Sequence, residues 1–558
     1  MITQPASRQL SPRNIPSLWQ TCYWVVLGLV FAGAAWQRFS RPLDPIADPD
    51  TWGYLSPALR KLTGAEFGHT NGRNFLYPGF LYLVLAAFGD FRAIGVVQHL
   101  LGLAAGGIFL VTWRRVRVFV PNSLVNPATH YLIGLIGVAI YLLATDTIQI
   151  ETQLRPEAVC GFFISLNLFF ASQFVAFSFL KPSRPAALIY GIATVFTALL
   201  LASLRPNFWF AAMTLTIPAA AFFVQPSWWP EKIALAVSLI VAGLVILWPE
   251  HILARKDDAS RTFLPTMLFV IHADLIRDQM AVDLRRNVNL PYPREWLDRV
   301  YNSLNAEIAK SQKKYPGHYR SLRFDPEYLW FAPSSISTQL TRQFGRDVGG
   351  LCAFYQYYYW RIWQHRPLRV LGKIARQLSI YYFPKCPAYS SAKIWPLRDA
   401  YQRGITTVEL KDYRKVSISL PAAADFARRI KLLAQNAPVV EQTRLLRIPL
   451  GILSISHLLC LLLALTLSAV VFWKRDRWKE LRWLAALVLF GFAYNAASCL
   501  EVAVVNSLEV YRYITVQMYA TLLTQLLALW LILEFIFQAQ SDSACVTRQT
   551  LATRESTL

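Results

Sequence analysis

The chain has little negative charge and few residues of the types that hold metals. Of its 558 residues, 33 are Asp or Glu and 56 are Lys or Arg, and it has only 8 His and 7 Cys. No CxxC, HExxH or P-loop sequence occurs in it. The sequence therefore gives no support for a zinc site, a thiol redox centre or a nucleotide-phosphate site of these common types.

Cysteine is too sparse for a disulfide framework. Five of the seven cysteines lie in or beside apolar runs or in the C-terminal tail, where a lone Cys usually serves as a small apolar residue. Cys352 and Cys386 both fall in the long polar segment described below, and they could pair in an oxidising compartment.

We expect no cleavable signal peptide. The first twenty residues are polar and contain Pro5, Pro12 and Pro16, and no small-residue cleavage pattern follows the first apolar run. We therefore expect that run to stay in the membrane as a signal anchor.

Apolar sequence, in contrast, is abundant: 55% of the residues are hydrophobic and 14% are aromatic. Apolar windows of about 18–22 residues recur, which is the length that crosses a bilayer as a helix. We predict an all-α polytopic membrane protein with about ten transmembrane helices, at residues 21–36, 93–113, 128–145, 158–180, 185–204, 207–225, 233–249, 447–472, 483–500 and 514–537.

One further apolar run, 75–89, is too short to cross comfortably, and Pro78 and Gly79 interrupt it. We predict a helix lying in the outer membrane interface, with Tyr77 and Tyr82 as anchors.

Short basic loops orient the predicted spans. The loops 114–117, 181–184 and 474–482 are rich in Arg and Lys, and they fall on one side when ten spans alternate. Both termini join them, and the positive-inside rule makes this side cytoplasmic. The segment 251–446 then lies outside, although it carries +15 of the net charge of +23. Because the rule applies to short loops only, this segment does not reverse the orientation.

Five regions follow from this topology. We expect a cytoplasmic tail at 1–20, a transmembrane module at 21–249 with a first external loop at 37–92, an extracytoplasmic basic insert at 250–446, further transmembrane helices at 447–537, and a cytoplasmic tail at 538–558. The insert has no run long enough to span, and we predict it to be mostly helical.

Two stretches of the insert show helical character, at 294–310 and at 354–383, the second broken at Pro367. The second stretch combines aromatic with basic residues. It could lie on the outer leaflet against anionic headgroups, or belong to a small helical domain with a basic solvated face.

Three carboxylates crowd the first external loop, where "DPIADPDTWGYLSPA" (44–58) contains Asp44, Asp48 and Asp50. An ordinary turn-forming connection would carry acids freely, and Pro45 and Pro49 favour a turn. However, Asp48 and Asp50 precede a predicted short helix with Ser56 as N-cap and Pro57 at its first position. Aromatic residues, Trp52 and Tyr54, stand beside them. A carboxylate in this setting is suited to activating a hydroxyl.

Further charges reach the same side from other loops. The second external loop, 145–158, carries Asp146, Glu151, Arg155 and Glu157. Arg205 and Arg512 lie at the outer ends of predicted spans. A single arginine there could merely snorkel, but acids and arginines from four loops favour a site for a negatively charged, partly lipidic ligand.

These residues resemble the GT-C superfamily of membrane glycosyltransferases, which includes protein O-mannosyltransferases and lipid A aminoarabinose transferases. The resemblance rests on a pattern in the first external loop, the interfacial stretch 75–89, an acid opening a long helix, a basic residue before Pro, and an Arg-Tyr pair before a late span. These are, in order, Asp50-x-x-x-Tyr54-x-x-x-Ala58, "FLYPGFLYLVLAAFG", Glu157, Arg205-Pro206 and Arg512-Tyr513. Where the family often has a second acid directly after the first, this chain has Thr51, with Asp48 two residues before Asp50.

The resemblance implies a GT-C-like fold and a transferase that takes a sugar from a polyprenyl-phosphate donor. It implies Asp50 as general base, with Asp48 as the alternative. It further implies arginines that bind the donor phosphate (Arg205, Arg512 and Arg155) and residues that position the substrate (Tyr54, Glu157 and Tyr513). Asp50 and Glu157 could share a divalent cation, Mg or Mn, since some family members use a metal and others do not.

The expected acceptor is a glycolipid, polysaccharide or protein of the cell envelope, at the periplasmic face of a bacterial inner membrane. Membrane lipids are expected partners, and nucleic acid is not. A transporter or flippase of lipid-linked glycans is the alternative, but it should bury ionisable groups near mid-membrane. A membrane scaffold whose insert binds a partner is a further alternative.

Overall fold

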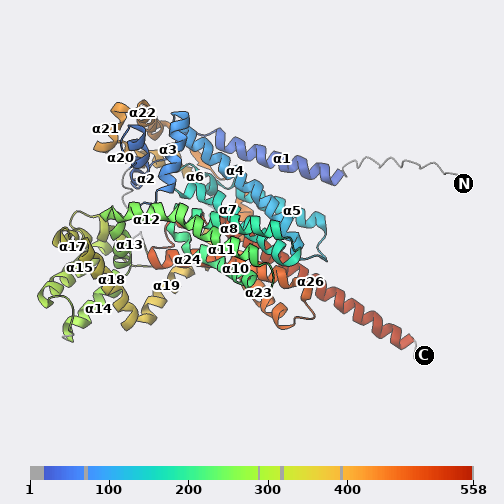
Figure 1. Ribbon diagram of the computed structural model, residues 1–558. Coiled ribbons are helices and arrows are strands. Elements are labelled where there is room, and N and C mark those ends of the chain that lie inside the picture. Colours follow the sequence, from blue (N-terminus) through green and yellow to red (C-terminus); the bar gives the residue numbers. More distant parts are fainter. Residues whose placement is uncertain (1–17, 68–72, 287–288, 315–318, 390–393, 556–558) are drawn as a thin grey trace.

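The chain forms a bundle of long apolar helices with a helical insert at one end (Figure 1). The computed structural model describes residues 18–67, 73–286, 289–314, 319–389 and 394–555, and it is 81% helical. Figure 1 shows the ends of α1 and α26 that lead to the two termini on one side of the bundle and the helices of the insert on the opposite side.

Nine helices or helix pairs of the described residues are long and apolar enough to cross a membrane. They are Leu18–Phe39, Arg92–Phe119, Glu157–Leu180, Arg184–Leu204, Pro206–Val224, Trp229–Arg255, Arg444–Trp473, Lys479–Val505 and Met518–Ser541. A further pair of helices, Pro127–Leu143 and Thr145–Glu151, is bent by 51° and passes the same test when the two are taken together, which makes nine or ten candidate spans. The prediction of an all-α membrane protein with about ten spans is therefore confirmed.

The long helices of this bundle are α1 (Leu18–Phe39), α4 (Arg92–Arg115), α5 (Pro127–Leu143), α7 (Glu157–Val175), α8 (Arg184–Leu204), α23 (Arg444–Trp473), α24 (Arg482–Val505) and α26 (Met518–Glu555). Two spans are broken, one into η3 (Pro206–Phe208), α9 (Trp209–Thr214) and α10 (Thr216–Val224), the other into α11 (Trp229–Ala242), η4 (Gly243–Leu247) and α12 (Trp248–Arg255). Short helical turns η1 (Val116–Phe119), η2 (Ala176–Leu180) and η6 (Lys479–Leu481) lie at the ends of α4, α7 and α24.

Four shorter helices lie at the ends of the spans: α2 (Thr51–Leu62), α3 (Leu76–Phe88), α6 (Thr145–Glu151) and α25 (Tyr511–Thr515). The predicted start of α2 was wrong, because the helix begins at Thr51 with Asp50 as its N-cap and holds Pro57 in its interior. The Asp48 side chain explains the early start. Its Oδ1 accepts hydrogen bonds from the Asp50 amide (3.0 Å) and from the Thr51 hydroxyl (3.2 Å), which fixes the first turn ahead of Pro57.

The run predicted to lie in the interface forms α3, a helix of 13 residues that ends at Gly89. Gly89 has φ +63°, a left-handed conformation that glycine adopts at helix C-termini without steric cost. The placement of α3 in the membrane interface stays a prediction.

The insert is mostly helical, as predicted. Its first part contains α13 (Asp258–Ile271), α14 (Ala273–Arg285), α15 (Arg294–Lys314), α16 (Pro326–Phe331), α17 (Ile336–Phe344), α18 (Val348–His365), α19 (Pro367–Tyr382) and η5 (Pro387–Tyr389). Its second part contains α20 (Leu397–Val408), α21 (Lys411–Ser419), α22 (Pro421–Asn436) and an antiparallel pair, β1 (Ile394–Pro396) with β2 (Val439–Glu441). The predicted break before Pro367 is present, and Cys352 and Cys386 are free thiols, so they form no disulfide.

A buried ion pair joins α1 to the end of α6. Arg38 of α1 is fully buried and donates two hydrogen bonds of 2.7 Å to the Glu151 carboxylate at the end of α6. His99 of α4 lies 2.9 Å from the same carboxylate. Gly102, one turn further along α4, makes room for it, because a Cβ there would lie 2.0 Å from Glu151 Oε1. This cluster holds the loop that leads to Arg155 and Glu157.

We predict that Glu151→Ala will lower the melting temperature by several degrees, because it leaves the Arg38 guanidinium buried without its partner. Breaking a buried pair in this way costs about 3–5 kcal/mol, whereas replacing both partners by apolar residues is often neutral. Thermal unfolding in detergent should therefore show recovery in the double variant Arg38→Met/Glu151→Leu. Wild-type melting of Glu151→Ala would contradict a stabilising role for the pair.

Candidate functional site

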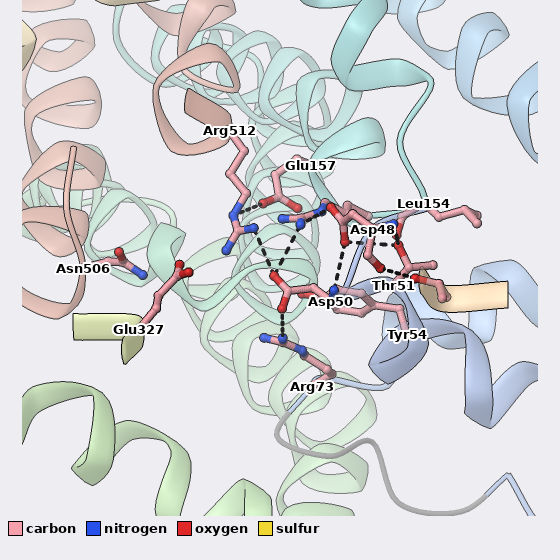
Figure 2. A network of polar contacts seen from close by, with 12 residues as sticks. Asp48, Asp50, Thr51, Tyr54, Arg73, Leu154, Glu157, Glu327, Asn506 and Arg512 are labelled. Atoms are coloured by element: carbon pink, nitrogen blue, oxygen red, sulfur yellow. Dashed lines mark hydrogen bonds and ion pairs between the residues drawn. The ribbon is translucent and has the colours of Figure 1, made fainter. Parts of the chain in front are cut away.

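The loop that carries Asp48 and Asp50 meets the segment 152–154 through an isolated β-bridge. The Ile46 amide donates to the Thr152 carbonyl (2.7 Å), and the Leu154 amide donates to the Ile46 carbonyl (3.0 Å). This pairing brings the carboxylates of Asp48 and Asp50 to the residues that follow Leu154, namely Arg155 and Glu157. Figure 2 shows the resulting network.

The Asp48 carboxylate forms an ion pair with Arg155. Burial raises the pKa of Asp48 to about 6, and the neighbouring charge of Asp50 adds to this effect. The carboxylate therefore loses its charge when the pH falls through about 6.

Asp50 contacts three guanidinium groups. Arg73 Nη2 donates to its Oδ1 (3.1 Å) and Arg512 Nη1 to its Oδ2 (3.0 Å), while Arg155 Nη2 lies 3.4 Å from Oδ2. Burial alone would raise the pKa of Asp50, but the charges of Arg512, Arg73 and Arg205 outweigh it and lower the pKa. The two neighbouring aspartates therefore have pKa values displaced in opposite directions, a pattern that in enzymes separates the roles of paired carboxyl groups.

Glu157, at the first position of α7, is almost fully buried beside two arginines. Its Oε1 lies 2.9 Å from Arg205 Nη2 and 3.6 Å from Arg512 Nε. These are ion-pair distances, but the groups are not oriented for hydrogen bonds, and both carboxylate oxygens lack a hydrogen-bond partner within the described part of the chain.

Several buried N–H groups of the same arginines are also without an acceptor among the described residues: Nε of Arg155, Nε and Nη2 of Arg205, and Nε of Arg512. Buried polar groups are nearly always hydrogen-bonded in proteins, so unpaired donors at one place point to a ligand. Four arginines surround three carboxylates here, so the cluster carries an excess of positive charge that favours an anion.

Two tyrosines complete the walls of the cluster. The Tyr54 hydroxyl accepts a hydrogen bond from Arg205 Nη1 (3.3 Å), and the Arg73 guanidinium lies 5.1 Å from the centre of its ring. The Tyr513 ring lies 4.9 Å from the Arg205 guanidinium and 5.0 Å from that of Arg512. Such cation–π contacts hold the arginines in place without using up their N–H donors.

The structure thus brings together all eight residues predicted for the site: Asp48, Asp50, Tyr54, Arg155, Glu157, Arg205, Arg512 and Tyr513. Three other predicted charges lie elsewhere. Asp44 pairs with Arg429 of α22 (2.7 Å), Glu151 belongs to the buried pair with Arg38, and Asp146 accepts a hydrogen bond from the Tyr511 hydroxyl.

Arg73 was missed by the sequence analysis. It lies just before α3, in a loop that also carries Arg41, Arg60 and Lys61, and only its position between the polar loop and an apolar helix set it apart. Figure 2 also shows Glu327 of α16 and Asn506 facing the network. Glu327 accepts a hydrogen bond from the Tyr319 hydroxyl (2.5 Å), and the Asn506 side-chain amide donates one to the Tyr513 hydroxyl (3.0 Å).

The insert holds both sides of the network. On one side, Thr407 and Tyr401 of α20 donate to the carbonyls of Asp48 (2.6 Å) and Asp44 (2.7 Å). The backbone around Asp44 and Asp48 is therefore fixed from α20.

On the other side, a second set of contacts precedes Arg512. Gln377 of α19 accepts hydrogen bonds from the Ser507 hydroxyl and the Leu508 amide, both at 3.0 Å. Ser321 donates to the Glu509 carboxylate from its hydroxyl (2.7 Å) and its amide. The insert therefore positions the arginine as well as the aspartate.

The residues present do not fit a divalent cation at Asp50 and Glu157. No group of three or more His, Cys, Asp or Glu that could hold a metal occurs among the described residues. Each of the two carboxylates faces guanidinium groups at 2.9–3.0 Å, which compete with a cation for the same oxygens. No step proposed below uses a metal.

Comparison of the chain with known protein families, with curated proteins and with solved structures found no match. The likeness to GT-C enzymes therefore rests on the residues quoted above, and the chain is assigned to no family.

We predict that an amphiphile with a phosphate group binds at these arginines. Dodecyl phosphate added to the protein in neutral detergent should raise the melting temperature of the wild type, and Arg205→Gln should reduce that rise by more than half. Arg92→Gln serves as the control, because Arg92 pairs with Asp90 at an exposed position. Equal stabilisation of wild type and Arg205→Gln would exclude Arg205 from anion binding.

Proposed function

We propose that this integral membrane protein is a glycosyltransferase that moves a sugar from a polyprenyl-phosphate donor to a cell-envelope acceptor at the extracytoplasmic face of the membrane. The observation that carries the proposal is the pairing of a carboxylate of lowered pKa, Asp50, with buried arginine donors that lack acceptors. Sugar transfer from a lipid phosphate needs both a base for the acceptor hydroxyl and positive groups for the leaving phosphate.

The arginines would bind the donor first. The unpaired N–H groups of Arg205 and Arg512 supply hydrogen bonds to phosphate oxygens, for which guanidinium geometry is well suited. A phosphate bound there competes with Asp50 for Arg512, so donor binding raises the basicity of a carboxylate that is otherwise held ionised. The base thus becomes effective when the donor is in place.

In the transfer step, the acceptor hydroxyl oxygen forms a bond to the anomeric carbon and gives its proton to Asp50. The bond between that carbon and the phosphate oxygen breaks, and the polyprenyl phosphate leaves with the electron pair. Arg205 and Arg512 stabilise the charge that develops on the leaving oxygen. The Tyr513 ring keeps both arginines oriented, and the Tyr54 hydroxyl accepts a hydrogen bond from Arg205.

The placement of acids supports a transferase over a transporter or flippase. Four carboxylates of the described spans lie near helix ends, at Glu231, Glu250, Glu480 and Glu501. Glu534 of α26 accepts hydrogen bonds from the Ser123 hydroxyl and the Leu124 amide of the adjoining loop. A translocation path would instead gather several ionisable groups near the middle of the membrane, whereas His457 in the middle of α23 is buried and bonded to Gln525.

We predict that Asp50→Asn abolishes transfer while the protein still inserts and accumulates. Mass analysis of envelope glycolipids and polysaccharides should show the sugar added by the wild type missing from both the deletion strain and the Asp50→Asn strain. The control is Asp90→Asn, since Asp90 is also an external-loop carboxylate paired with two arginines, Arg92 and Arg429. Near-normal product with Asp50→Asn would refute the assignment of the base, and an unchanged envelope in the deletion strain would refute the proposed function.

We also predict a fall in transfer rate below about pH 6, where Asp48 takes up a proton. Because its pKa is raised, the carboxylate is charged and paired with Arg155 above this pH, and it releases Arg155 as the pH falls through it. Initial rates in membranes between pH 5 and 8 should decline about tenfold per pH unit on the acidic side, as for one essential ionisation. The Asp48→Asn variant should transfer slowly and should no longer show the decline in rate on the acidic side. If that variant keeps the same decline, the ionisation belongs to another group.

A further inference from the structure

One face of α19 in the insert is apolar and exposed. Leu368, Leu371 and Ala375 follow one another at helical spacing, and Leu368 is 82% exposed. Arg369 and Arg376, seven residues apart, lie on one flank of this face and are also exposed. The opposite face of the helix is buried and packs on the protein, with α24 among its neighbours. The exposed face has the pattern of a helix that lies at a membrane surface.

The C-terminal end of α19 does not point away from the bundle but runs along its spans. The Tyr382 hydroxyl donates to Asn495 Oδ1 of α24 (3.0 Å), and the Tyr382 ring stacks on His457 of α23, with 5.9 Å between the ring centres. The Cys386 amide then donates to the Ser454 carbonyl of α23 (3.0 Å). The chain from α19 to Cys386 is therefore attached to two predicted spans well inside their ends.

The lipid-facing side of α23 shows how deep in the membrane this attachment lies. Its exposed apolar side chains begin at Leu445 and, beyond Arg447, run without interruption from Ile448 through Ile455 to Leu459. His457 lies nine residues beyond Ile448, which is about 14 Å along an α-helix. Phe383, at the end of α19, is 65% exposed at this level. An apolar side chain so placed faces acyl chains and not water.

The turn after α19 also meets the condition that the membrane interior sets for non-helical backbone, namely that its polar groups are bonded within the protein. The Cys386 amide and carbonyl both bond to Ser454, the latter by accepting from the Ser454 hydroxyl (2.8 Å). Pro384 and Pro387 have no N–H to satisfy. Cys386, Ala388 and Tyr389 are buried against the spans.

We propose that α19 and the turn to Tyr389 form a re-entrant segment that lies in the membrane leaflet on the insert side and binds anionic lipid. Its apolar face contacts acyl chains through Leu368, Leu371 and Phe383. Arg369 and Arg376 lie at headgroup level, and the exposed Lys385 extends its long side chain from the deeper turn towards the phosphates. Arg369 also lies 3.3 Å from Asp278, an exposed pair that leaves most of its guanidinium open to a second partner.

Photo-crosslinking of the full-length protein tests the position of this segment. Benzoylphenylalanine at Leu371 or at Phe383, in nanodiscs of POPC with POPG, should give lipid adducts detectable by mass spectrometry. Ile455 of α23 serves as a lipid-facing positive control, and the exposed Glu295 of α15 as a negative control. Adducts at Ile455 but at neither Leu371 nor Phe383 would overturn the proposal.

The charge requirement has its own test. The triple variant Arg369→Gln/Arg376→Gln/Lys385→Gln should lose at least half of the rise in melting temperature that POPG gives over POPC. A matched triple variant, Arg299→Gln/Arg342→Gln/Arg346→Gln, removes three exposed charges elsewhere in the insert and should keep that rise. The same loss in both triple variants would show a general charge effect and overturn the specific role of α19.

Discussion

The ion pair between Asp50 and Arg512 is the contact on which the rest of the site depends, because it joins groups 462 positions apart in the chain. Asp50 is held by the bridge between its loop and the segment 152–154, and Arg512 by the turn before the last span. Both side chains are only partly buried, with exposures of 30% and 21%, and each has other partners, Arg73 and Arg155 for Asp50 and Glu157 for Arg512. The pair therefore matters chiefly because it fixes where these two distant parts of the chain meet.

The insert makes this long-range pairing possible. Its second part fixes the backbone around Asp48 through α20, and its first part fixes the turn before Arg512 through Gln377 and Ser321. The insert is thus a frame for the site, whatever substrate it also contacts. If α19 rests in the membrane as proposed, the same helix that carries Gln377 links lipid contact to the placement of Arg512.

The spans were predictable because each must present a long apolar run, and their positions agree with the sequence to within a few residues. The site charges stood out because they lie beside such runs. The start of α2 was mispredicted because a side chain, Asp48, bonds the backbone ahead of Pro57. Gln377 and Thr407 gave no signal, since a polar residue on an amphipathic helix resembles any solvated one until the fold supplies its partner.

The single bridge at Ile46 has a consequence for how this loop can vary over evolutionary time. Because the bridge is made by backbone groups, it asks of the side chains at 46 and 154 only that they fill their buried places, as Ile46 and Leu154 do. The distance along the chain from the bridge to each aspartate is not free in the same way. Inserting or deleting one residue there would move both carboxylates away from their arginine partners, so this loop should tolerate apolar substitution at the bridge far better than a change of length.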